Sequence, residues 1–371
     1  MKLLRIFYYP VLLGVVLVSC TGKDYLKLPV KEIYFKNLTD TLVHGNETDV
    51  HVLGAKSILV CDTFLVVLTN DDQGFLKIYS TESMNYLGSF CSRGRAKNEF
   101  IKPSFHENAY KEGSDVILPI ADNGLIRKDV NISKSIIEEK TIILSETELM
   151  NSSIGCSFTL YQDTSKLFVQ YYSVASSTKF ETPKYYYKKG NKETEVKVFP
   201  RIVQSEADHV AFVGYSSRIY RHPSQDIFVE AFKLRDYLFY FDFETNSHYA
   251  VHQEGSLSFD DYYDESAFSE GDEQVNYFWS GVCTDNFIMF LYGAGDYCIK
   301  SKDYKSSVTP QEVLVFDWSG NYLCGVKLDI RLHVITYDKK HKVLYGLNKA
   351  SELIYSFDLS DYIERYETND L

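Results

Sequence analysis

The sequence predicts an all-β fold, a six-bladed β-propeller, on three observations. The chain of 371 residues contains 30 Tyr and 24 Phe, and aromatic side chains favour pleated, half-buried strands. Few stretches show helical periodicity. A strand–turn–strand pattern recurs with a mean step of about 56 residues, which is in the range of propeller repeats.

The recurring unit is a pair of alternating strands joined by a polar turn. We expect it at Phe75–Phe90, Gly124–Ile137, Lys184–Phe199, Tyr237–His252 and Glu312–Leu328, with a half-copy at Glu352–Ser360. Further strand-like runs between these hairpins bring each unit to about four short strands, the pattern of a propeller blade. A set of two-sheet sandwiches is the alternative, but the chain contains no visible linkers between such domains.

The ring of blades is expected to close through the N-terminal part of the chain. Glu32–Leu38 is a strand-like run with no local partner, and the last unit lacks a fourth strand after Asp358. Pairing the two as the outer part of the last blade would remove two exposed edges. We therefore expect residues 31–371 to form one domain. Short helices are expected at Ser145–Met150 and in the acidic stretch after Ser256.

The N-terminus has the features of a bacterial export signal. Lys2 and Arg5 precede an apolar run, Ile6–Val18, which is shorter than the roughly 20 residues that span a bilayer. Leu17-Val18-Ser19-Cys20 resembles the lipobox of bacterial lipoproteins. The resemblance implies that residues 1–19 are a signal peptide, that Cys20 is lipidated, and that residues 20–30 form a tether. The alternative, a retained transmembrane helix, is disfavoured by the short run and its proline.

Two further segments carry a family resemblance. SFCSRGRAKNEF follows the first hairpin, and VFDWSGNYLCGVKLD lies near the C-terminus. Together with the lipobox, they resemble the TolB-like six-bladed propeller lipoproteins of the Bacteroidetes. Gly94, Arg95, Glu99 and Phe100 match a glycine-rich family segment, whereas Ala96 and Asn98 stand where that segment has glycines. The resemblance implies an architecture and an envelope location, and it implies no activity.

Charge and cysteines limit the classes of function. The formal net charge is −12, so binding to nucleic acid or to anionic lipid heads is not expected. Beyond Cys20 the cysteines are scattered without metal-like spacing. Local disulfides at Cys61–Cys91 or Cys283–Cys298 are one interpretation, and we favour the other, in which most of these cysteines are unpaired and buried.

The loop Arg93–Phe100 is the first candidate binding site. Its cations are Arg93, Arg95 and Lys97, on an otherwise acidic protein, and arginine suits carboxylate ligands. The structural interpretation, which we favour, is that Arg95 pairs with Glu99 to brace the crossover while Phe100 fills the space between two blades.

The acidic stretch Ser258–Glu273 is the second candidate. It occupies the longest interval between repeats and places Tyr262 and Tyr263 among carboxylates. The spacing does not fit an EF-hand loop, so we expect a solvated insertion, with the tyrosines as a candidate lip for a partner.

No motif for a catalytic nucleophile, a zinc helix or a phosphate loop is present. His248 and His252 share a strand face but have no obvious third ligand, so we expect no metal site and no cofactor. The enzyme alternative is a hydrolase or lyase at the mouth of the axial channel, with or without calcium. Its candidate residues are Asp62, Asp122, His209 and Asp285.

We therefore favour a monomeric binding or scaffold module over an enzyme. The lipid would attach it to the outer membrane, and its partner would be an envelope protein, a peptide or a glycan. Thr21-Gly22-Lys23-Asp24 contains one acid and one base. Since surface-exported lipoproteins of Bacteroidetes carry several acids there, the segment favours the periplasm-facing side.

Overall fold

The computed structural model describes residues 31–367 except for positions 38, 40, 106–107, 124–125, 149–155, 162–165, 172–180, 183–184, 190–191, 196–201, 204–216, 234, 243–246, 257–272, 276, 294–296 and 300–308. Side chains are not described in 156–203, 273–275 and 297–299, nor at 365 and 367. No helix among the described residues is long and apolar enough to cross a membrane.

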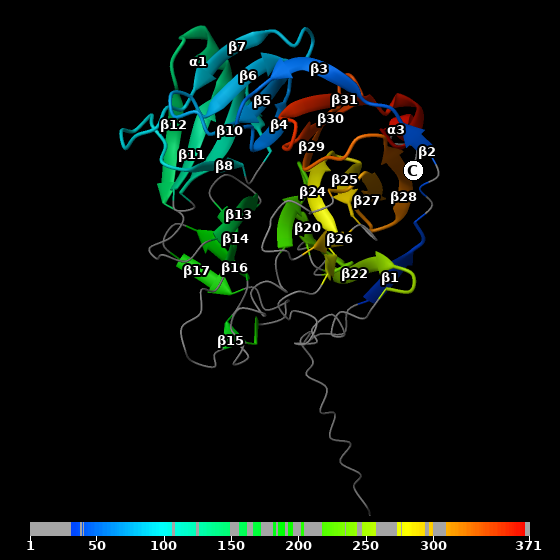
Figure 1. Ribbon diagram of the computed structural model, residues 1–371. Coiled ribbons are helices and arrows are strands. Elements are labelled where there is room, and N and C mark those ends of the chain that lie inside the picture. The colour runs from blue at the N-terminus through cyan, green and yellow to red at the C-terminus, as the bar shows by residue number, and fades with distance from the viewer. Residues whose placement is uncertain are drawn as a thin grey trace, which may run out of the picture.

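The protein is an all-β propeller, as predicted (Figure 1). Blade 1 consists of β4 (Ser57–Cys61), β5 (Phe64–Leu68), β6 (Leu76–Ser80) and β7 (Tyr86–Phe90). Blade 2 consists of β8 (Pro103–Phe105), β9 (Tyr110–Glu112), β10 (Asp115–Asp122), β11 (Ile126–Asn131) and β12 (Ile143–Glu148).

Three more blades come from the second half of the chain. Blade 3 consists of β19 (Ser217–Arg221), β20 (Ile227–Phe232), β21 (Leu238–Asp242) and β22 (Ser247–Gln253). Blade 4 consists of β24 (Phe278–Cys283), β25 (Phe287–Tyr292), β27 (Glu312–Asp317) and β28 (Tyr322–Leu328). Blade 5 consists of β29 (Val334–Asp338), β30 (Val343–Asn348) and β31 (Leu353–Asp358), completed by β3 (Asn46–His51).

Apolar clusters join these blades in the order 2, 1, 5, 4, 3. Leu76 and Leu118 lie in the cluster between blades 1 and 2, and Leu65 lies in the cluster between blades 1 and 5. Blades 4 and 5 meet around Phe287, and blades 3 and 4 meet around Phe316. Each such side chain contributes roughly 1.5–3 kcal/mol through burial, so these interfaces are the main source of stability.

The predicted number of six blades is wrong. Among the described residues, apolar side chains join five sheets into neighbouring blades. Among the described side chains, no apolar cluster extends beyond blade 2 on the side away from blade 1. There β11 carries the buried pair Arg127 and Asp129, with 2.8 Å between Nη2 and Oδ1. Strand alternation turns these two residues away from Leu118 and blade 1.

A further four-stranded sheet follows blade 2 along the chain. It contains β13 (Cys156–Tyr161), β14 (Lys166–Tyr171), β16 (Tyr185–Lys189) and β17 (Lys192–Glu195). Its first strand lies beside β19. Because its side chains are not described, it is not counted among the five blades. Two-stranded sheets are formed by β15 (Glu181–Thr182) with β18 (Ile202–Val203) and by β23 (Glu273–Val275) with β26 (Tyr297–Ile299).

The N-terminal part of the chain runs along the outer strands of three blades, and we call residues 31–51 the N-terminal strap. β1 (Lys31–Phe35) pairs in parallel with β22, and β2 (Thr41–Val43) pairs in parallel with β28. β3 then pairs with β31. The prediction that Glu32–Leu38 closes the last blade is therefore wrong, because that run begins on blade 3 and the closing strand is β3.

One aromatic side chain anchors the strap. Phe35 is buried, and its ring centroid lies 5.1 Å from that of Phe316 and 5.6 Å from that of Tyr322. The side chain belongs to blade 3 through its strand and packs on blade 4. The strap thus joins two blades by packing as well as by backbone pairing.

Two local predictions fail for identifiable reasons. The run Gly124–Ile137 is not a hairpin, because Asn131 caps α1 (Ile132–Ile137) by accepting a hydrogen bond from Lys134 N at 2.8 Å. The helix expected at Ser145–Met150 is replaced by β12, which pairs with β11. The helix expected after Ser256 lies outside the described residues.

The other hairpins are confirmed by strand pairing at β6–β7, β16–β17, β21–β22 and β27–β28. The chain ends its described part with α3 (Ser360–Glu367), whose Ile363 is buried against blades 4 and 5.

The preference for unpaired cysteines is confirmed among the described side chains. Cys61, Cys91, Cys283 and Cys324 form no disulfide. Burial raises the pKa of the Cys61, Cys91 and Cys283 thiols, so they behave as small apolar side chains rather than as nucleophiles.

We predict that Phe35→Ala lowers the free energy of unfolding by about 3–5 kcal/mol, because it leaves a cavity between blades 3 and 4. Urea denaturation followed by tryptophan fluorescence measures the change. Leu42→Ala, at an exposed position of the same strap, is the control and should change stability by less than about 0.5 kcal/mol. Equal effects of the two substitutions would contradict the anchoring role.

Candidate functional site

The propeller presents two faces with different chemistry. We call one the hairpin face, because it carries the turns between the first and second strands of each blade, such as 222–226, 284–286 and 339–342. The other is the crossover face, where the chain passes from one blade to the next. Antiparallel strands place these two kinds of connection at opposite ends of every blade.

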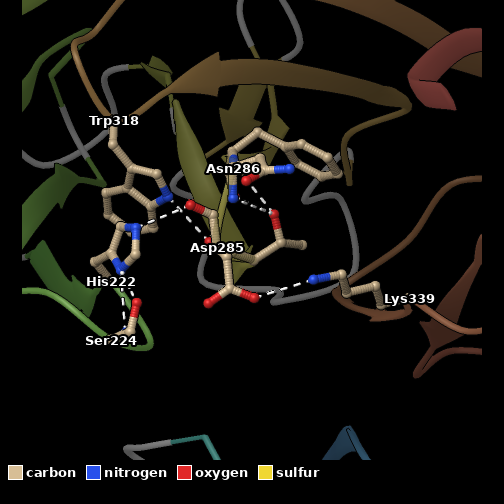
Figure 2. A network of polar contacts seen from close by, with 8 residues as sticks. His222, Ser224, Asp285, Asn286, Trp318 and Lys339 are labelled. Atoms are coloured by element: carbon tan, nitrogen blue, oxygen red, sulfur yellow. Dashed lines mark hydrogen bonds and ion pairs between the residues drawn. The ribbon is translucent and has the colours of Figure 1, made fainter. Parts of the chain in front are cut away.

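A polar network on the hairpin face joins blades 3, 4 and 5 (Figure 2). The backbone carbonyl oxygen of Asp285 accepts a hydrogen bond from His222 Nε2 at 2.9 Å. The carboxylate of Asp285 lies 3.0 Å from Lys339 Nζ. One turn residue of blade 4 therefore contacts both neighbouring blades.

His222 is fixed in one neutral form by its partners. Nδ1 accepts hydrogen bonds from Ser224 N and Gln225 N, each at 3.1 Å, so the proton sits on Nε2 and is donated to Asp285 O. Burial lowers the pKa of His222, although the Asp285 contact opposes this shift. At neutral pH the ring is a structural contact and is not available as a general base.

Trp318 extends this network from the outer hairpin of blade 4. Its Nε1 donates to Thr284 O at 2.9 Å, and its ring lies 4.7 Å from the His222 ring. Tyr249 of blade 3 donates its hydroxyl hydrogen to Trp318 O at 2.8 Å. The network therefore joins blade 3 to blade 4 at two places, between their inner turns through His222 and Asp285 and between their outer strands through Tyr249 and Trp318.

The same kind of contact occurs at the remaining described interfaces. Lys340 of blade 5 pairs with Glu82 of blade 1. Lys111 of blade 2 pairs with Asp62 of blade 1 at 2.8 Å. These exposed pairs add at most about 1 kcal/mol each, so they align neighbouring blades more than they stabilise them.

The structure separates the residues proposed for a catalytic site. Asp62 and Asp285 lie on the hairpin face, each paired with a lysine of the neighbouring blade. Asp122 lies on the crossover face, where Oδ1 accepts from Ile101 N at 2.8 Å and from Lys102 N at 2.9 Å. His209 lies outside the described residues. Asp122 is thus separated from Asp62 and Asp285, and each of the three aspartates is held by groups of its own or a neighbouring blade.

The loop Arg93–Phe100 lies on the crossover face between blades 1 and 2. Phe100 is fully buried between these blades, as predicted. The expected contact of Arg95 with Glu99 is replaced by a local one, because a Glu99 carboxylate oxygen accepts from Ala96 N at 2.8 Å. That carboxylate lies directly against Gly94, where a Cβ atom would be 1.8 Å from it.

A buried lysine supports the loop from below. Lys128 Nζ donates to Glu99 O at 2.6 Å and to Lys97 O at 3.3 Å, and it lies 4.8 Å from the centroid of the Phe100 ring. The sequence analysis did not identify Lys128. The sequence does contain an indication of its role, because the three charged residues Arg127-Lys128-Asp129 interrupt an otherwise strand-like run.

The three cations of the loop differ in their partners. Arg93 pairs with Asp72 at 2.6 Å and lies over the Phe75 ring. Arg95 and Lys97 are exposed, and in the described part of the chain neither has an ion-pair partner. The loop therefore holds a fixed backbone and presents two cations to solvent.

The other sequence candidates remain predictions. Cys20, Tyr262 and Tyr263 lie outside the described residues. Within those residues, no group of three His, Cys, Asp or Glu side chains could hold a metal ion. His252 is instead enclosed by aromatic rings, with Tyr34 and Tyr237 each at 4.4 Å between centroids.

The fold defines the chain as a β-propeller. No family model and no curated protein matches it. Solved structures do match. A member of the DUF4221 family from Bacteroides vulgatus is similar at 11% identity with a TM-score of 0.55, over 85% of this chain and 95% of that one. A Bacteroides fragilis protein described as exported is similar at 11% identity with a TM-score of 0.51, over 88% and 99%. At this identity the likeness shows the fold.

We predict that stability falls as the pH drops below about 6.5, the usual histidine pKa. The folded pKa of His222 is lowered, so the unfolded chain binds the proton first, and stability is lost until the folded ring also protonates. The pKa values of His252 and His333 are also lowered by burial. Urea midpoints at a series of pH values measure this decline.

The variant His222→Asn tests the contribution of this ring. Asn can still accept from the turn amides but does not titrate. The variant should show a shallower decline below pH 6.5 than the unmodified protein, with about 1.4 kcal/mol lost for each unit by which the pKa was lowered. An identical decline in both proteins would contradict the assignment.

Proposed function

We propose that this protein is a lipid-anchored β-propeller of the bacterial cell envelope that acts as a binding or scaffold module. Its partner would be an envelope protein, a peptide or a glycan. The observation that carries the proposal is the loop Arg93–Phe100, whose backbone is held by Lys128 while Arg95 and Lys97 are exposed. A loop fixed in advance binds with a smaller loss of conformational entropy.

The charge of the loop suggests the kind of contact. Guanidinium and ammonium groups suit carboxylates of a partner, and the chain as a whole carries a net charge of −12. A cationic loop on an acidic protein provides orientation, because an acidic partner is repelled elsewhere and attracted there.

The proposed location rests on the sequence together with one neighbour. The lipobox at Cys20 supports a lipid anchor, and the similar Bacteroides fragilis protein is described as exported. The segment Thr21–Asp24 supports the periplasm-facing side of the outer membrane. The TolB-like resemblance and the monomeric state remain predictions.

We predict that Cys20→Ser abolishes membrane attachment. Without the thiol no acyl chain can be added, and the protein should move from the membrane fraction to the soluble periplasmic fraction. Metabolic labelling with a palmitate analogue should mark the unmodified protein and not the variant. Retention of the variant in the membrane fraction would contradict the lipid anchor.

We predict that the double substitution Arg95→Glu and Lys97→Glu lowers partner capture about tenfold or more, because it converts attraction into repulsion. The measurement is photo-crosslinking in intact cells from a probe at Asn98, with crosslinked species quantified by mass spectrometry. Lys140→Glu, a charge reversal at an exposed lysine after α1, is the control and should leave capture unchanged. Equal capture by all three proteins would show that the loop does not bind the partner.

A further inference from the structure

A second group of cations gathers where the inner strands begin on the crossover face. Lys56 directly precedes β4, and Arg218 is the second residue of β19. Lys233 follows β20, and Lys349 follows β30. We call these four residues the axial cation cluster. They come from blades 1, 3 and 5, so only the folded propeller brings them together.

The inner strands set the position of this cluster. β19 lies beside β24, β24 beside β29, and β29 beside β4. Figure 1 shows β4, β29 and β24 following one another on the inner side of their blades. All four start on the crossover face. Residues at their first positions and in the adjoining turns therefore converge on the propeller axis.

Side-chain contacts connect the cluster across blade 4. Lys233 Nζ lies 5.5 Å from the centroid of the Trp279 ring, and that ring lies 6.5 Å from the His333 ring in an edge-on arrangement. Lys349 N donates to His333 Nδ1 at 3.1 Å. Trp279 and His333 thus separate the two lysines and fix the turns that carry them.

The charges in this cluster act on one another. The pKa of Lys349 is lowered, first by burial and then by the positive charges of Arg218, Lys233 and Lys56. The pKa of His333 is likewise lowered by burial and by Lys349. Lys349 is an exposed residue, and it lies where the neighbouring cations already give a surplus of positive charge.

The described residues supply no counter-charge to most of the cluster. Arg218 contacts the Tyr220 hydroxyl, but in the part of the chain that the structure describes, no carboxylate forms an ion pair with Lys56, Arg218 or Lys349. On the hairpin face, by contrast, Lys111, Lys339 and Lys340 all have acidic partners. Lys56, Arg218 and Lys349 repel one another without a described counter-charge, which costs stability, and such an arrangement is typical of a binding site.

We propose that the axial cation cluster binds a ligand with two or more negative charges, carried by carboxylate or phosphate groups. The inference rests on the proposed binding function and names a ligand class for it. Lys349 and Arg218 would contact the anion directly, and Lys56 and Lys233 would add to the local positive potential.

The test is thermal unfolding and calorimetric titration of the purified full chain with citrate and with pyrophosphate, at physiological ionic strength. A ligand that binds only the folded state raises the melting temperature. Stabilisation by citrate alone would identify a carboxylate ligand, by pyrophosphate alone a phosphate ligand, and by both a site for either. No stabilisation by either anion would overturn the proposal.

Two variants locate the site. Lys349→Gln and Arg218→Gln should each weaken anion binding about tenfold or more, and neither should lower the melting temperature without anion, because each removes a repulsive charge. Lys140→Gln is the matched control and should bind as the unmodified protein does. Equal affinity in all variants would place the anion elsewhere and reject this site.

The two binding experiments fail independently. Substitution of Arg95 and Lys97 changes the loop between blades 1 and 2 and should leave citrate and pyrophosphate affinity within about twofold. If the unmodified protein binds neither anion but its partner capture depends on Arg95 and Lys97, only the axial site is refuted. If it binds an anion but its partner capture does not depend on Arg95 and Lys97, only the loop is refuted.

Discussion

The structure depends on apolar packing between neighbouring blades. A four-stranded sheet has two faces and cannot bury both alone, so each blade is stable only when its neighbours cover it. Residues such as Leu118, Phe287 and Phe316 supply this cover at the described interfaces. The exposed ion pairs of the hairpin face align blades that the core has already joined.

The two faces show how one scaffold can separate support from binding. On the hairpin face, Asp285 accepts a hydrogen bond from His222 and forms an ion pair with Lys339, which belong to the two adjacent blades. On the crossover face, buried groups such as Lys128 and Asp122 hold the backbone. Arg95, Lys97 and Lys349 are exposed there and form no ion pair with a described residue. Longer connections on that face give it room to vary without disturbing the core.

The sequence predicts the propeller class because strand alternation and polar turns are local properties of the chain. It does not predict the pairing of Glu32–Leu38, since β1 could pair with any outer strand, and contacts made only in the folded protein, such as Phe35 with blade 4 and Tyr34 with His252, favour β22. The helix α1 was missed because the cap at Asn131 outweighs the alternating pattern of Ile132–Ile137.

The candidate site divides in the same way. The cations of the loop Arg93–Phe100 are visible in the sequence, and Phe100 was correctly expected between blades. Lys128 was missed because its role depends on a fold that brings it below a loop about 30 residues away. The axial cation cluster could not be predicted, because Lys56 and Lys349 become neighbours only when the ring assembles.

The N-terminal strap also determines the order in which the molecule can be completed. β1, β2 and β3 precede the other described strands in the chain, but β31, the partner of β3, is made some 300 residues later. Each strand of the strap stays unpaired until its partner strand has been synthesised, and until then the side chains of Tyr34 and Leu42 are accessible to chaperones. Assembly of the propeller can therefore finish only after β31 has been synthesised. A product truncated before β31 would leave blade 5 with an exposed edge strand, which proteases can recognise.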